Sequence, residues 1–308
     1  MDIIFIPLSL AAGSLLAVQA GANAQLSKAV ASPFAATTLQ LSVGALVLAL
    51  VMLGTGTASA LASLPGAVWW HAVGGTASAF YVVSTILLFP RLGAVVTVGL
   101  FIAGQMLASL ALDTFGLLGV AASGLTPGAA FGTLTVLAGA ALIVFGQKGG
   151  ADALSPAKLG WIGLALVAGA VLPVQGAVNA LLRQDLGGAP FAAAAVSFVV
   201  ATLAMAAVLV VSLMLPATQR PQLAGVKAMP WWGWLGGFAG ATYVTTVFTA
   251  IPVIGTAAAV GFTVAGQQVA SVFVDRFGWF RLPERPVSPL RLAGVGLLLA
   301  GVVLIKAL

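Results

Sequence analysis

The chain has 308 residues, of which 61% are hydrophobic and only 6% are charged, and its formal net charge is +6. A soluble domain carries about 25% charged residues, so this composition excludes a protein surrounded mainly by water and indicates that lipid contacts much of its surface. The basic residues are scattered singly and form no stripe that follows a phosphate backbone, which argues against nucleic acid as a partner. The absence of cysteine excludes disulfides, thiolate catalysis and Cys-ligated metals.

Ten apolar segments follow one another along the chain, separated by turns that contain Gly, Pro and Ser. A helix needs about 20 apolar residues to cross the hydrocarbon core of a bilayer, and each segment approaches that length. All seven tryptophans lie at segment ends or in loops, as expected for an aromatic belt. The sequence therefore predicts an all-α membrane protein with ten transmembrane helices. The segments are residues 3–24, 34–53, 69–89, 93–112, 128–146, 159–181, 191–215, 231–251, 254–274 and 290–307.

Positive charge is distributed unevenly over the predicted loops. With ten membrane spans, the loops that follow the odd-numbered segments share one side and carry all but two of the 12 Lys and Arg residues. The other side holds only Arg183 and Lys306. By the positive-inside rule the charged loops face the cytoplasm. Both termini are then expected to lie outside.

The second half of the chain repeats the first. A shift of 162 positions aligns residues 69–116 with residues 231–278 without a gap, and 20 of the 48 aligned pairs are identical. Near the start of each half a shift of 156 positions aligns a Gly, a Gln and an Asn with the same residue types. These aligned residues are Gly13, Gln19 and Asn23 in the first half and Gly169, Gln175 and Asn179 in the second.

Each half of the chain, residues 1–150 and residues 151–308, holds five of the predicted helices. Because five is an odd number, the second copy must be inverted in the membrane relative to the first. The loop charges agree, since most basic loop residues, such as Arg91 and Arg276, align with uncharged residues in the other copy. Inverted repeats are typical of alternating-access transporters, whose substrate site lies between the repeats near the midplane. We therefore expect a central cavity between the two halves.

Three short motifs occur in both halves of the chain. They are Val18–Ala24, Gly104-Gln105 and Asp113–Gly116 in the first half, and Val174–Ala180, Gly266-Gln267 and Asp275–Gly278 in the second. With the paired five-helix halves, they resemble the drug/metabolite transporter superfamily, and within it the YdcZ-like branch of bacterial inner-membrane proteins. The resemblance covers nearly the whole chain. It implies a ten-helix basket around a central cavity, a place in the bacterial inner (plasma) membrane, and export of small organic molecules.

Small relatives in this superfamily use a carboxylate in their first helix to bind cationic drugs and protons, but this chain has only amides there. Gln19 and Asn23 are four residues apart and so share one helix face, and Gln175 and Asn179 repeat this spacing in the sixth helix. Buried amides need hydrogen-bond partners. The two pairs are candidates for a neutral site that binds a polar or zwitterionic substrate, or for contacts that join helices, each worth about 1 kcal/mol. The sequence leaves both interpretations open.

Further candidates lie in the third, fourth, eighth and ninth helices. Tyr81 and Tyr243 could stack on a ligand or hold a cation. Gln105 and Gln267 each follow a glycine that permits close approach, so they are candidates for lining the cavity or for packing. The glycines that begin Gly-x3-Ser at 74–78 and Gly-x3-Gly at 236–240 have the spacing of closely packed membrane helices. We expect them to pack within the fold, with a homodimer as the alternative.

Asp113 and Asp275 end the fourth and ninth predicted helices. Each is a candidate for a gating or proton-coupling acid, or for an acid that caps a loop. The chain has no phosphate-binding loop, no His/Glu metal motif and no catalytic Ser-His-Asp set, so we expect no enzyme activity, cofactor or metal. The sequence therefore predicts a secondary transporter, and an exporter of small organic metabolites or drugs, that works by alternating access. The alternatives are a non-transporting membrane scaffold or assembly protein and a passive channel.

Overall fold

The computed structural model describes residues 2–92, 94–145, 159–215, 220–281, 284 and 288–307. Within these residues the chain forms helices and turns, with no strand. A long helix lies in each of the predicted segments. The long helices are α1 (Phe5–Val30), α2 (Pro33–Gly54), α4 (Thr76–Leu92), α5 (Ala94–Phe115), α6 (Pro127–Phe145), α8 (Leu159–Asp185), α9 (Pro190–Leu213), α10 (Leu235–Ile254), α11 (Thr256–Phe277) and α12 (Pro289–Ala307).

Seven of the described helices are long and apolar enough to cross a membrane, and α6 and α12 contribute shorter apolar stretches. The surface is apolar to match. Leu46 and Leu50 of α2 are each 60% exposed, and Leu203 of α9 is 65% exposed. Soluble monomers rarely expose large contiguous apolar patches. These faces therefore contact lipid.

The helix ends follow from turn residues. Ser32 Oγ accepts a hydrogen bond from the backbone N–H of Ala35 at 3.2 Å, and Pro33 occupies the first turn of α2. Gly255, with a φ of 83°, separates α10 from α11. The third and eighth predicted segments each begin with short helical turns before the long helix. These are α3 (Trp69–Ala72) and the 3-10 turn η3 (Val73–Gly75) before α4, and the 3-10 turn η7 (Trp231–Trp234) before α10. Gly74 and Gly75, which have low helix propensity, lie in η3, whereas the aligned Gly236 and Gly237 lie within α10.

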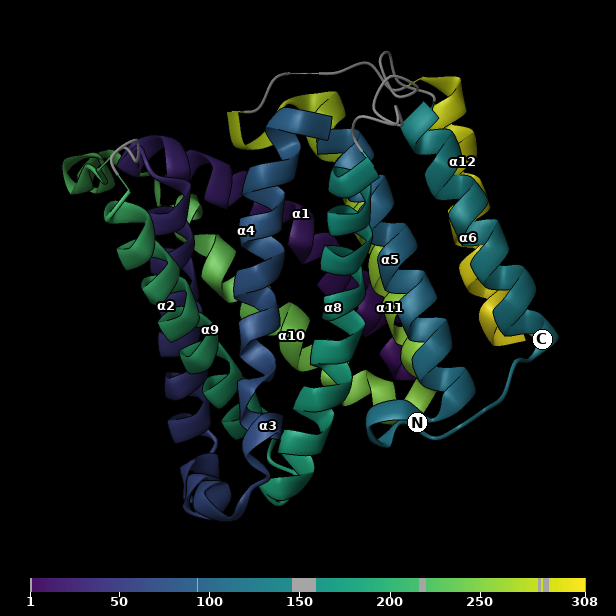
Figure 1. Cartoon of the computed structure of the whole chain (residues 1–308), viewed down its shortest axis with the longest axis horizontal. Coiled ribbons are helices and arrows are strands. Elements are labelled where there is room, and N and C mark those ends of the chain that lie inside the picture. The colour runs from purple at the N-terminus through teal and green to yellow at the C-terminus, as the bar shows by residue number, and fades with distance from the viewer. Residues whose placement is uncertain are drawn as a thin grey trace.

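The two halves of the chain are interleaved. α1 of the first half packs against α10 and α11 of the second, and α8, which begins the second half, packs against α4 and α5 of the first. Helix α2 packs on α9, and α6 packs on α12 at one edge of the bundle (Figure 1). Both chain ends lie toward the end of the bundle where α3 lies, which we call the terminal end (Figure 1). Each half thus places its first helix against the other half.

Glycines allow the interleaved helices to approach at backbone distance. A methyl group on Gly13 of α1 would lie 2.6 Å from the Cα of Thr263 in α11. One on Gly169 of α8 would lie 2.7 Å from the Cα of Phe101 in α5. Gly13 aligns with Gly169 and Thr263 aligns with Phe101, so one contact occurs twice. The reciprocal glycine contacts place Gly266 on Leu10 and Gly104 on Leu166.

The contact between α6 and α12 uses the same principle. Gly132 lies against Gly301, and Gly139 lies against Gly294. Within lipid no hydrophobic effect drives helices together, so close packing through small residues holds them. The glycines of the small-x3-small motifs also pack inside the bundle, since Gly74 lies against Asn179 of α8.

We predict that Gly13→Ala destabilises the protein. Its methyl group would overlap the backbone at Thr263, and overpacking a core costs about 1–3 kcal/mol. Gly163→Ala in α8 is the matched control, because nothing lies within 4 Å of the methyl group it adds. Thermal unfolding in detergent should show a lower Tm for Gly13→Ala and no loss for Gly163→Ala. Equal Tm values for the two variants would contradict the close contact of α1 with α11.

Candidate functional site

The amides of the second half are engaged with neighbouring helices. Gln175 and Asn179 of α8 are both buried. Gln175 Nε2 donates to Ser78 Oγ of α4 at 2.9 Å, and Ser78 Oγ donates to Gln175 Oε1 at 3.1 Å. Asn179 Nδ2 donates to Ser197 Oγ of α9 at 3.1 Å. These bonds join α8 to a helix of each half.

The amides of the first half lie in a different environment. Gln19 and Asn23 of α1 are half-buried, and neither side chain hydrogen bonds within the described residues. Asn23 Oδ1 is buried without a partner, and so are Nε2 of Gln25 and Oδ1 of Asn179 on α8. Gln19 lacks the kind of partner that Gln175 has, because the position that aligns with Ser78 is Gly240, which offers no hydroxyl group. A methyl group added to Gly240 would lie 2.6 Å from Nε2 of Gln19, so the glutamine amide packs directly against this glycine.

The two tyrosines lie in the interior. Tyr243 of α10 is buried, and Tyr81 of α4 is half-buried. Tyr81 packs on the ring of Phe101 with 4.8 Å between centroids, and Tyr243 contacts the side chain of Thr263 at the aligned position. Each tyrosine therefore ties its own helix to the next helix of the same half.

The glutamines of α5 and α11 differ in exposure. Gln105 is buried and Gln267 is half-buried. The backbone carbonyl of Gln105 accepts from Ser109 Oγ at 2.6 Å, and that of Gln267 accepts from Ser271 Oγ at 2.7 Å. These are bonds within one helix, so the side-chain amides themselves stay candidates for the cavity.

Asp113 at the end of α5 holds the start of α11. Its Oδ1 accepts from the backbone N–H of Thr256 at 2.8 Å, and its Oδ2 accepts from that of Ala257 at 2.6 Å. A carboxylate is favourable at a helix N-terminus, where unpaired N–H groups and the helix dipole attract negative charge. The bonds cross from one half to the other. The side chain of Asp275 lies outside the described residues.

A second link between the halves was not predicted. His71 Nδ1 of α3 lies 2.6 Å from Asp185 Oδ2 at the end of α8, and the same oxygen accepts from the backbone N–H of Val68 at 3.3 Å. The two residues are far apart in the sequence and have no charged counterparts in the repeat, so nothing in the sequence pairs them. This contact ties α3 to α8 at the terminal end.

The two ends of the bundle differ at two pairs of aligned positions, Phe280 with Leu118 and Gly21 with Ala177. At the end opposite the termini, the ring of Phe280 in η8 (Trp279–Arg281) lies against Gly21 of α1, where a methyl group would come within 2.6 Å of its Cγ. The Trp232 ring packs on Phe280 with 5.7 Å between centroids, and Arg281 lies 5.8 Å from the Trp232 ring. Phe280 has a φ of 59°, a conformation that costs energy for a residue with a side chain. Packing of the ring onto α1 offsets that cost.

At the terminal end the aligned residues border open space. Leu118 and Ala177, which align with Phe280 and Gly21, line a cleft of about 480 Å³. The junction of α10 and α11 forms another of its walls. Asp113 and Gln184 supply polar groups, and Ile251 is among the apolar ones.

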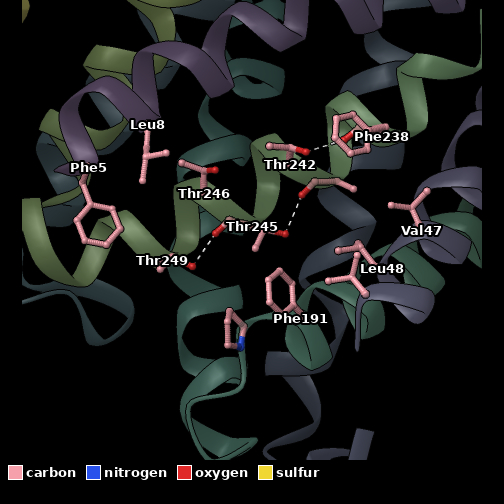
Figure 2. Close-up of a pocket in the computed structure, with 13 residues that line it drawn as sticks. Phe5, Leu8, Val47, Leu48, Phe191, Phe238, Thr242, Thr245, Thr246 and Thr249 are labelled. Atoms are coloured by element: carbon pink, nitrogen blue, oxygen red, sulfur yellow. Dashed lines mark hydrogen bonds between the residues drawn. The ribbon is translucent and has the colours of Figure 1, made fainter. Parts of the chain in front are cut away.

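A lateral groove of about 340 Å³ lies between α1, α2, α9 and α10. Figure 2 shows four threonines in a row along α10, with Phe5 and Leu8 of α1 on one side and Val47 and Leu48 of α2 on the other. Three of these hydroxyl groups donate to backbone carbonyls of their own helix. Their oxygens remain able to accept, so the groove suits an apolar body with a hydrogen-bond donor. The threonines are Thr242, Thr245, Thr246 and Thr249.

Sequence reasoning missed both the cleft and the lateral groove. Each is built from helices that are distant in the chain, and neither is lined by Gln19, Asn23, Gln175 or Asn179. One signal was present: the threonines of α10 align with Phe80, Val83, Ser84 and Leu87 of α4, so the two copies differ in polarity at this face.

Comparisons with known proteins agree with this architecture. A family model described as "Putative inner membrane exporter, YdcZ" matches residues 4–142 and 160–304. No curated protein matches the chain. Among 11 matching chains of solved structures, one described as "Crystal structure of protein" has a TM-score of 0.68 at 19% identity, over 99% of this chain and 96% of that chain. At that identity the likeness shows the fold alone.

We predict that Asp113→Ala lowers thermal stability. The substitution leaves two backbone N–H groups of α11 without their acceptor, and losing such a cap costs about 0.5–2 kcal/mol. Asp185→Ala is the comparison at the same end, where the lost contact is with His71. Thermal unfolding in detergent measures both. An Asp113→Ala protein as stable as the wild type, with transport lost, would favour a gating or proton-coupling role instead of a cap.

Proposed function

Because the chain belongs to the YdcZ family of inner membrane exporters, a multi-pass membrane family, we propose that it is a secondary transporter that exports small organic molecules by alternating access. The single observation that carries the mechanism is the difference between the two ends of the bundle. Aligned residues form an aromatic plug at one end and border a cleft at the other. A transporter with one end closed and the other open has this arrangement.

In the proposed topology all ten long helices span the membrane as two inverted five-helix repeats, residues 1–150 and 151–308. The twofold occurrence of the α1–α11 contact as α8–α5 supports this relation. By the positive-inside rule the loop charges favour a topology with both termini outside. In this topology the terminal end faces out and the plug at Phe280 faces the cytoplasm. The structure then corresponds to a state closed toward the cytoplasm.

Rocking of the repeats would exchange the open and closed ends. Two contacts cross between the halves at the terminal end in the present state. Asp113 binds the start of α11, and His71 binds Asp185. The substrate would bind between the halves near the midplane. Candidate binding residues are Gln19, Asn23, Gln175, Asn179, Tyr81, Tyr243, Gln105 and Gln267, and candidate gating or proton-coupling acids are Asp113 and Asp275.

Reconstitution in liposomes tests transport directly. Small metabolites and cationic drugs that raise the Tm of the purified protein would be assayed for flux, with and without a pH gradient. We expect saturable flux of at least one hit, and flux that follows the gradient would add proton coupling. A folded protein that binds and moves nothing across a broad panel would contradict transport and favour the scaffold. Flux that does not saturate would favour a channel.

The absence of cysteine allows a clean test of orientation. Ser63, in η2 (Thr57–Gly66) between α2 and α3, and Ala224, in η6 (Leu223–Ala228) between α9 and α10, are both exposed. In cells with an intact inner membrane and a permeabilised outer membrane, an impermeant maleimide should label Ser63→Cys. Ala224→Cys should react only after lysis. The reverse pattern would overturn the proposed orientation.

A further inference from the structure

The aligned amide pairs of α1 and α8 have different surroundings, and this difference assigns them different roles. We propose that Gln19 and Asn23 bind the substrate and that Gln175 and Asn179 are structural. The ligand is an uncharged molecule whose amide-like polar group binds to α1. This inference rests on the proposed transport function and names the substrate class of its site.

Most polar groups of the pair on α8 are engaged. Gln175 exchanges two hydrogen bonds with Ser78, and Asn179 donates to Ser197, although Asn179 Oδ1 accepts no hydrogen bond. A ligand would have to break these bonds and leave a buried hydroxyl group without its partner, which is unfavourable. All three hydrogen bonds join α8 to another helix, so their loss would also weaken the packing of α8. This pair therefore joins helices.

The pair on α1 lacks these partners. Gly240 stands where α4 has Ser78, and Gln40 stands where α9 has Ser197. The amide of Gln40 donates to the backbone carbonyl of Gly236 at 3.4 Å, and the side chain of Gln19 has no partner within the described residues. Asn23 Oδ1 is also without a partner, but so is Asn179 Oδ1, so the contrast between the pairs lies in the two glutamines. Buried polar groups in native proteins are nearly always hydrogen-bonded, so a group left without a partner needs an explanation. A ligand that supplies the missing bonds is the explanation proposed here.

The charge of the surrounding helices restricts the ligand. Together α1, α2, α9 and α10 contain one charged residue, Lys28, which is exposed in the last turn of α1. A cationic ligand would be buried without a counter-ion, and burying an unpaired charge is costly. Each amide offers both a donor and an acceptor. A neutral carboxamide, amide or alcohol fits this combination.

Exchanging the two aligned residues of the repeat provides the test. Gly240→Ser gives Gln19 the hydroxyl partner that Gln175 already has, and the only close clash is with the flexible end of Gln19. Ser78→Gly removes that partner from Gln175. The probe is octanamide, which joins a neutral amide to an apolar chain, and binding is measured by tryptophan fluorescence in detergent. Thermal unfolding confirms that each variant is folded.

We expect Gly240→Ser and Gln19→Ala to weaken octanamide binding about tenfold, the value of one net hydrogen bond. Ser78→Gly should keep the wild-type affinity while lowering the Tm. Octanoate and octylamine, which carry charges on the same chain, should bind at least about tenfold more weakly than octanamide. Unchanged octanamide binding in Gly240→Ser and Gln19→Ala would overturn the proposal. Equal affinity of the charged analogues would overturn the ligand class.

Failure of this inference can be told apart from failure of the transport function. Saturable flux of a substrate that is insensitive to Gln19→Ala and Gly240→Ser would refute the site and leave the transporter intact. Octanamide binding that both variants weaken, in a protein that moves nothing across liposomes, would support the site and refute transport.

Discussion

The fold depends on the close approach of α1 to α11 and of α8 to α5, which glycine makes possible. At Gly13 and Gly169 the backbone of the partner helix occupies the space that any side chain would need. In lipid such contacts replace the hydrophobic effect as the source of helix association. Because each contact joins the first helix of one half to the other half, the main hydrophobic clusters contain residues of both halves.

This arrangement explains how duplication can lead to different roles. The helix contacts use backbone and glycine, so they persist in both copies while the side chains around them diverge. Ser78 and Gly240 are one such divergent pair, and Gly21 and Ala177 are another. The first pair changes the hydrogen bonding of a glutamine amide, because Ser78 binds Gln175 and Gly240 offers no hydroxyl group to Gln19. The second pair changes whether an aromatic ring can pack on the helix, as Phe280 packs on Gly21. Two substitutions in a repeated frame thus give an asymmetric interior.

The sequence predicted the helical class, the segments and the family. The length of an apolar segment can be read locally, and the repeat is found by aligning the sequence with itself. It also placed the small-x3-small glycines inside the fold, as Gly74 confirms. It left the roles of the amides open, because their partners come from other helices and only pairing in space distinguishes Ser78 from Gly240. The partner of Asp113 was out of reach for the same reason, since its bonds cross to backbone groups more than 140 positions away.

Expression of the two halves as separate chains, cut between residues 150 and 151, tests the shared core most directly. Each half alone would expose the surfaces that α1 or α8 buries in the other half. We expect each half expressed alone to aggregate or be degraded, and the co-expressed halves to copurify as one complex with a cooperative thermal transition. A half that is monodisperse and unfolds at the temperature of the intact protein would show that the repeats fold independently, and would contradict the interleaved core.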